Sequence, residues 1–287
     1  MQSFFKKLPR YSLRLLLAYL VYIFTGGVLA YLLPRQARNL PQTDSFYGIG
    51  RGPDRAVLVE EPQDAFARRV EVIRTAQSTL DVCYHCVKSG ETTECFFAEL
   101  LRAADRGVRV RVLLDGTVGG LSGARSNIAL ALRAHPNIEY RIYNPVDLLR
   151  PWEWNALLHD KFILADDRML LLGGRNIGDE YFAPPGYEGA VTYDRDVLVL
   201  NDLAGTPDSS ESVTAQAKIY MDTLWDAPET DKFGTLSPSR RADGLAAQEY
   251  LKETAARWEA AAPSFYLPSE PASQCAVPTQ RVTLLHN

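Results

Sequence analysis

The segment His159-Asp160-Lys161 carries the residue types that phosphoryl chemistry uses. A neutral imidazole attacks phosphorus, and an ammonium two residues further on the same face of a strand neutralises a phosphate oxygen. The later segment Gly173-Gly174-Arg175-Asn176 is a glycine turn that lets an asparagine amide approach the same phosphate. We therefore interpret His159, Lys161 and Asn176 as candidate groups for cleaving a phosphodiester, with the two glycines as backbone that contacts the phosphate.

The spacing of these residues follows the pattern H-x-K-x4-D, from His159 to Asp166, and then x6-G-G-x-N. This pattern resembles the signature of the phospholipase D superfamily, and the residues around it resemble the bacterial cardiolipin synthase branch. The resemblance continues through 103–110 and 194–197 and covers roughly residues 64–225, a span typical of one domain. It implies an α/β fold, with a mixed β-sheet flanked by helices, and chemistry through a phosphohistidine that requires no metal and no cofactor.

The resemblance also implies a role for each matched side chain. His159 would be the nucleophile or, alternatively, the general acid for the leaving group, because the family uses one histidine for each role. Lys161 and Asn176 would hold the non-bridging phosphate oxygens. Asp166 matches the acidic position of the signature, where a turn-stabilising role is favoured over direct proton transfer.

A carboxylate on a later strand is matched as well. Asp196 stands at the acidic position that, in the family, orients the nucleophilic imidazole. Such a partner fixes the tautomer of the ring and stabilises its charged form. Asp194 is the competing candidate for this role.

The chain departs from the family in carrying one copy of the signature, because the family normally holds two copies that build a single site. Residues 281–287 are similar to the opening strand of a second half. A truncation or a split gene is the preferred explanation, followed by a homodimer, as in single-signature members of the superfamily. Displacement at phosphorus needs a nucleophile and a proton donor, so the active unit is expected to pair this chain with a second-half polypeptide or a second copy.

The segment Cys83-Tyr84-His85-Cys86 has the spacing of a C-x-x-C motif. A redox motif of this kind opens a helix, whereas this segment ends an expected strand, and no second pair completes a four-ligand metal site. Structural cysteines are therefore favoured, and no bound metal is expected. Related synthases usually carry Gln and Tyr where Cys83 and His85 stand, so the lining of the cleft is expected to differ.

The amino terminus differs from the rest of the chain. Residues 15–33 contain 19 consecutive residues without a formal charge. A helix of that length, at about 1.5 Å per residue, crosses the hydrocarbon layer of a membrane. A cleavable signal peptide is the alternative, since Val28-Leu29-Ala30 offers small residues for cleavage, but the length of the apolar run favours an uncleaved anchor.

Basic residues are more frequent before this span than after it; they are Lys6, Lys7, Arg10 and Arg14 against Arg35 and Arg38. This bias predicts that residues 1–14 lie in the cytoplasm, that residues 15–33 span the membrane and that the catalytic domain lies outside the cytoplasm. The net charge of −4 gives no general attraction for nucleic acid, which is not an expected partner.

Beyond the span, residues 34–62 read as a tether, residues 63–226 as the phospholipase D-like domain, and residues 227–287 as a linker, a helix and the start of a missing second half. Within the domain, hydrophobic periodicity predicts alternating helices and strands. The predicted helices are 66–77, 96–104, 126–134, 213–225 and, after the domain, 245–262. The predicted strands are 79–84, 108–114, 138–143, 159–164, 169–172 and 197–200.

These features favour a membrane-anchored phosphatidyltransferase of the cardiolipin synthase type, whose substrate is a phospholipid phosphodiester and whose partner is the membrane. An exported hydrolase or nuclease that uses the same residues is the enzymatic alternative. A non-catalytic half domain, anchored in the membrane and serving as an assembly partner, is the alternative from another class.

Overall fold

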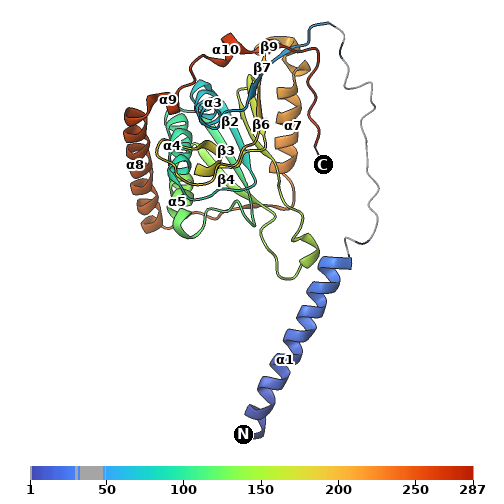
Figure 1. Ribbon diagram of the computed structural model, residues 1–287. Coiled ribbons are helices and arrows are strands. Elements are labelled where there is room, and N and C mark those ends of the chain that lie inside the picture. Colours follow the sequence, from blue (N-terminus) through green and yellow to red (C-terminus); the bar gives the residue numbers. More distant parts are fainter. Residues whose placement is uncertain (1, 30–31, 33–47, 49, 287) are drawn as a thin grey trace.

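A computed structural model describes residues 2–29, 32, 48 and 50–286 of the protein. The chain begins with α1 (Gln2–Phe24), which continues as the π-helical turn η1 (Thr25–Leu29) and projects away from the folded domain (Figure 1). Residues Tyr11–Leu29 have a mean hydropathy of 1.7 and none of this stretch is buried, so the helix is long and apolar enough to cross a membrane. A membrane anchor and a signal sequence both fit this helix; the end of the expected span at residues 30, 31 and 33 lies outside the described residues.

The domain is built on one mixed sheet with the strand order β8-β4-β3-β2-β5-β6-β7-β1-β9. β2, β3 and β4 are parallel, and the remaining neighbours are antiparallel. The strands are β1 (Asp54–Val59), β2 (Thr79–Tyr84), β3 (Arg109–Asp115), β4 (Ile138–Tyr143), β5 (Lys161–Ala165), β6 (Met169–Gly173), β7 (Asp196–Asn201), β8 (Thr230–Lys232) and β9 (Val277–Pro278).

Helices cover both faces of this sheet (Figure 1). They are α3 (Pro62–Thr75), α4 (Glu91–Asp105), α5 (Ser126–Ala134), α6 (Asp179–Phe182), α7 (Val213–Trp225), α8 (Pro238–Ala261), α9 (Pro263–Tyr266) and α10 (Ala272–Cys275). Alternate residues of β2 point to opposite faces, so Leu80 and Val82 join the core under α3, α4, α5 and α8, whereas Cys83 joins the core under α7. Because both faces are covered, β2 is almost wholly buried.

The topology brings several strand ends to one edge of the sheet. β2, β3 and β4 end there, and β5 and β7 begin there because they run in the opposite direction. β6 ends at the same edge. The carboxyl ends of parallel strands in α/β sheets are the usual place for ligands, so this edge is where the candidate residues are expected to meet.

The mixed α/β sheet flanked by helices is the architecture that the sequence predicts, but the expected tether is wrong at its end. Residues Asp54–Val59 form β1, which pairs with β7 along its whole length. The expected linker after residue 226 also contains regular structure, namely β8 and the first turns of α8. Ser237 caps α8 by accepting a hydrogen bond from the Arg240 amide, and Pro238 occupies the first turn, where it needs no amide hydrogen.

Residues 281–286 form no strand. They lie instead against α7, where the Leu284 amide donates to the Gln216 side chain at 3.0 Å and the His286 ring stacks on Tyr220 at 4.3 Å between centroids.

Candidate active site

The structure brings His159, Lys161 and Asn176 together around the end of β2. Each of the three contacts a different residue of the segment 84–86. These contacts are the β-pairing of Lys161 with Tyr84, the ring contact of His159 with His85 at 4.6 Å, and the 3.0 Å hydrogen bond from the Cys86 amide to the Asn176 side-chain oxygen. Residues from β5 and from the glycine turn therefore meet at the segment 84–86.

His159 is solvent-exposed and lies just before β5, in the connection that leads to Lys161. Partial burial lowers the pKa of its imidazole, and the positive charges of Lys161 and His85 lower the pKa further. The ring is therefore kept in the neutral form, which is the form that can attack phosphorus.

Lys161 is 5% exposed, and its Nζ donates a hydrogen bond to the His159 carbonyl at 2.5 Å. Burial lowers the pKa of this ammonium, while the carboxylates of Asp160 and Asp194 oppose that effect. An ammonium with little water around it interacts strongly with an incoming phosphate oxygen.

Asn176 is also buried, at the end of the glycine turn. Its side-chain oxygen is held by the Cys86 amide, and its nitrogen donates to the Tyr181 hydroxyl at 3.2 Å. An amide nitrogen carries two hydrogens, so the second is without a partner among the described residues and is available to a phosphate oxygen.

The glycines of the turn lie against carboxylates of this same chain, and Gly173 also lies against the backbone of Arg195 and Asp196. A Cβ at Gly173 would lie 2.0 Å from the Asp196 carboxylate, and a Cβ at Gly174 would lie 2.1 Å from the Asp194 carboxylate. Neither contact is possible for a real side chain, so the pair allows the start of β7 to approach the turn.

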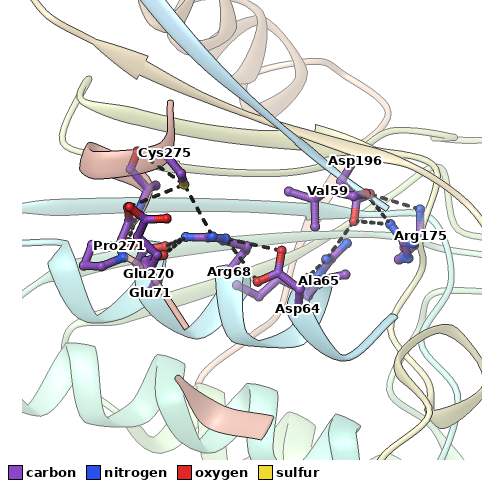
Figure 2. A network of polar contacts seen from close by, with 12 residues as sticks. Val59, Asp64, Ala65, Arg68, Glu71, Arg175, Asp196, Glu270, Pro271 and Cys275 are labelled. Atoms are coloured by element: carbon purple, nitrogen blue, oxygen red, sulfur yellow. Dashed lines mark hydrogen bonds and ion pairs between the residues drawn. The ribbon is translucent and has the colours of Figure 1, made fainter. Parts of the chain in front are cut away.

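Asp196 belongs to a buried ion-pair cluster beneath the turn. Its carboxylate accepts hydrogen bonds from Arg69 at 2.9 Å and from Arg175 at 3.1 Å, and Figure 2 shows the contact with Arg175. Burial raises the pKa of the carboxylate, but the two guanidiniums outweigh burial and hold the pKa below its usual range. Among the described residues none of its hydrogen bonds goes to His159, so its place differs from the imidazole partner expected from the sequence.

The same cluster ties the turn to α3 and β1. Arg69, on α3, also donates to the Tyr84 hydroxyl at 3.0 Å, and Arg175 donates to the Val59 carbonyl at 3.1 Å. Figure 2 shows that the preceding residue of α3, Arg68, contacts Asp64, Glu71 and the segment 270–275. The helix thus joins the candidate site to the carboxyl-terminal segment.

Asp194, the competing candidate for the imidazole partner, interacts with the Lys161 ammonium. It lies against Gly174 and is one of the charges that support the protonated form of Lys161. Its carboxylate accepts a hydrogen bond from the Arg195 amide at 2.8 Å.

Asp166 lies at the opposite end of β5 from His159. At about 3.3 Å per strand residue, the five residues of β5 separate the two by roughly 17 Å. Asp166 (φ 50°) and Asp167 (φ 55°) form a tight hairpin turn, and the Asp166 carboxylate accepts from the amides of residues 77–79 at 2.5–2.8 Å. This geometry is that of a structural residue outside the site.

Two further residues lie at this edge: Asp115, which the sequence analysis missed, and His85, which it expected only to change the lining of the cleft. Asp115, at the end of β3, is fully buried and accepts from the Leu158 amide at 2.9 Å. The Nδ1 of His85 lies 2.8 Å from the Leu158 carbonyl; since a carbonyl only accepts, Nδ1 carries the proton. An acidic residue that ends an apolar strand and precedes Gly116 was the available signal for Asp115.

All four cysteines are free thiols. Cys83 is fully buried in the core under α7, and burial raises its pKa well above the usual value. The described part of the chain holds no group of three or more His, Cys, Asp or Glu side chains that could bind a metal ion.

Residues 70–199 match the family model described as "Cardiolipin synthase, PLD-like domain". Cardiolipin synthase C of Escherichia coli is 39% identical over 152 residues, which are 50% of this chain and 31% of that protein. Cardiolipin synthase of Geobacillus thermodenitrificans is 29% identical over 164 residues, 55% of this chain and 32% of that protein. The chain thus matches about a third of the length of these curated relatives.

A solved structure, NucT from Helicobacter pylori, aligns with a TM-score of 0.48 at 15% identity and covers 63% of this chain and 99% of that one.

Proposed function

Because residues 70–199 form a phospholipase D-like domain related to cardiolipin synthases, we propose that this protein is a membrane-anchored phosphatidyltransferase that acts on phospholipid phosphodiesters. The observation that carries the proposal is the environment of His159. An exposed imidazole with a lowered pKa stands beside a buried ammonium, Lys161, and near a side-chain amide, Asn176. These are a nucleophile and two groups for the non-bridging oxygens of a phosphodiester.

In the first step His159 attacks phosphorus, so that an N–P bond forms and the bond to the leaving alcohol breaks. The leaving oxygen takes a proton from an acid, while Lys161 and Asn176 stabilise the charge on the phosphate oxygens. In the second step a lipid hydroxyl attacks the phosphohistidine: an O–P bond forms, the N–P bond to His159 breaks, and the hydroxyl proton passes to the conjugate base of the acid used in the first step. Attack by water instead gives hydrolysis, the outcome expected of a phospholipase or nuclease.

The acid for the leaving group is proposed to come from a second polypeptide. An in-line displacement places the leaving oxygen on the side of phosphorus opposite to the nucleophile. The ring of His85 lies 4.6 Å from that of His159 between centroids, tilted by 56°, so His85 lies on the nucleophile's own side. A second copy of this chain, or a second-half polypeptide, would supply a histidine from the opposite side.

A lipid substrate is supported by the apolar helix Tyr11–Leu29 beside the domain, because an anchor holds the site at a bilayer surface. The net charge of −4 argues against a nuclease, since proteins that bind nucleic acid rely on basic surfaces. Phospholipid is therefore preferred to nucleic acid as the source of the phosphodiester.

The test compares the full-length protein with the His159→Ala variant on phosphatidylglycerol vesicles and on DNA. We expect lipid turnover by the wild-type protein only in fractions that sedimentation shows to be paired, and a loss of at least about 1,000-fold in the variant with an unchanged melting temperature. Turnover by a demonstrated monomer would contradict the pairing, and wild-type activity in the variant would contradict the mechanism. An inactive protein in every state would favour the non-catalytic assembly partner.

A further inference from the structure

The connection between β4 and β5, residues 144–160, is long for a segment whose described structure is one short 3₁₀ turn, η4 (Pro151–Glu153). Its base is fixed. The Asn144 side chain donates to the carbonyls of Glu153 at 2.7 Å and Ala156 at 2.9 Å. At its other end the Leu158 amide is held by Asp115, one residue before His159. A movement of this connection is thereby linked to the position of His159.

The tip of the connection, residues 146–157, is apolar and exposed. Five of its large apolar side chains keep 40% or more of their surface accessible, whereas Trp154 is half-buried; the five are Val146 (52%), Leu148 (61%), Leu149 (73%), Trp152 (41%) and Leu157 (40%). Single exposed apolar side chains are ordinary, but a group of five in one loop marks a contact surface.

The tip packs against α1 (Figure 1). The Tyr19 hydroxyl donates to the Leu148 carbonyl at 3.0 Å, and the Tyr22 hydroxyl donates to the Leu149 carbonyl at 2.5 Å. The ring of Tyr22 also meets Trp152 edge-on, with centroids 6.2 Å apart. Two phenol hydroxyls and two loop carbonyls are satisfied by each other, which is what a hydrocarbon environment requires of polar groups.

The loop tip also packs closely against η1. A Cβ at Gly26 would lie 2.9 Å from the Pro151 ring, so only a glycine lets the loop approach so closely. At Gly27 the nearest atom would be the Pro151 carbonyl oxygen at 3.5 Å, an ordinary contact.

With α1 across a membrane, as in the proposed function, the tip lies at membrane depth. Tyr22 and Tyr19 precede Leu29, the end of the apolar stretch, by about two and three helical turns, or roughly 10–15 Å. The charged side chains of the tip are paired with one another, because Arg150 lies 3.5 Å from Asp147 and 3.6 Å from Glu153. The tip is thus level with the acyl chains of the leaflet at the end of α1.

We propose that residues 146–157 form a loop that inserts into the bilayer beside α1 and brings phospholipid phosphodiesters to His159 from the plane of the membrane. The occupant of this apolar surface is the lipid leaflet itself. The substrate in this inference rests on the proposed function, whereas the insertion rests on the contacts with α1.

Insertion is tested by photocrosslinking of the full-length protein in phosphatidylglycerol-containing nanodiscs. A photoreactive amino acid replaces Leu149 and, as the control, Leu245, which is 48% exposed on α8. Lipid adducts are expected from position 149 and not from position 245. Adducts at 149 no more frequent than at 245, or an α1 removed from the mature protein, would overturn the inference.

Lipid delivery is tested with the double variant Leu148→Ser/Leu149→Ser. The two substitutions remove apolar surface that would be buried among the acyl chains. Turnover of vesicle phosphatidylglycerol should therefore fall at least about tenfold. Turnover of the soluble phosphodiester bis(p-nitrophenyl) phosphate should not change, and the control Leu245→Ser/Leu267→Ser should leave both rates unchanged. An equal loss on both substrates, or no loss, would overturn delivery. A wild-type protein that turns over neither substrate contradicts the proposed function, and the crosslinking result then decides insertion alone.

Discussion

Of the two imidazoles at the site, His85 acts on His159 through charge. The Nδ1–H of His85 donates to the Leu158 carbonyl, which fixes the ring beside His159, and positive charge on His85 lowers the pKa of His159. We interpret His85 as a positioning residue. Its effect adds to those of partial burial and Lys161, which also lower the pKa of His159.

Replacing His85 by Gln should raise the pKa of His159. The proposed reaction needs neutral His159, so the activity is lost as pH falls through that pKa, and a higher pKa moves the acidic limb of the profile upward. The measurement is kcat/KM as a function of pH for both proteins. A purely structural role would lower kcat/KM at every pH and leave the limb in place, which would refute the charge effect.

Replacing Asp196 by Asn should destabilise the domain. The change leaves Arg69 and Arg175 buried without a full counter-charge, which costs about 3–5 kcal/mol. The folded-state pKa of Asp196 is lowered, so its contribution is present above the unfolded-state pKa and is lost as pH falls through the folded-state value.

Urea denaturation near pH 7 and at acid pH measures this effect, and the difference between the two proteins should shrink at acid pH. The control Glu249→Gln removes an exposed partner of Lys252 and should change the free energy of unfolding by less than about 0.5 kcal/mol. If Asp196→Asn lowered kcat and left the stability unchanged, the role expected from the sequence, orientation of His159, would be the better account.

At the scale of single residues, spacing along the chain identified the groups that meet at the site but not all of their contacts. His159, Lys161 and Asn176 share a local pattern, and the β5–β6 hairpin returns the chain to the same edge. Asp196 is held by Arg69, which comes from α3 far earlier in the sequence. The spacing of residues along the chain does not predict the Arg69–Asp196 ion pair, because this pair depends on how α3 packs on the sheet.

At the scale of elements, the hairpin between β5 and β6 depends on Asp166. Replacement by Ala leaves three backbone amides without their acceptor, and the cost per lost partner is about 1–3 kcal/mol where the amide cannot reach water. Asp166→Ala should therefore lower the melting temperature, whereas Asp166→Asn, which keeps an acceptor oxygen and tolerates positive φ, should lower it less.

The proposed role predicts that kcat per folded molecule stays within about threefold of wild type in both Asp166 variants, because the residue lies far from His159. Active-site titration together with thermal denaturation separates the two quantities. A large fall in kcat in a fully folded Asp166→Asn protein would show that the carboxylate takes part in the reaction.

Elements with strong periodicity were predicted closely. The strands 79–84 and 138–143 and the helices 126–134 and 213–225 begin and end in the structure as the pattern indicates. β1 was missed because it is short, follows a region rich in Gly and Pro, and gains its stability from pairing with β7. The β4–β5 connection was also missed, since periodicity describes regular elements and says little about where a long loop folds.

At the scale of the whole molecule, the positive charge before the apolar helix predicts the orientation of the domain. With Lys6, Lys7, Arg10 and Arg14 on the cytoplasmic side, the domain should lie outside the cytoplasm. Protease added to intact spheroplasts should digest the chain beyond residue 38 while a cytoplasmic control protein survives. Full protection of the domain, with digestion of a periplasmic control, would reverse the orientation.

The contact between Gly26 and Pro151 means that α1 is not an exchangeable tether. An unrelated apolar helix of equal length would serve the proposed anchoring equally well, yet it would lack the hydroxyl donors of Tyr19 and Tyr22 and the close approach to Pro151 that Gly26 allows. A shortened protein that starts at residue 48 would lack α1 altogether. Its β4–β5 loop would then expose Leu148 and Leu149 to water. Such a protein should self-associate in detergent-free buffer through this patch, which analytical ultracentrifugation would detect.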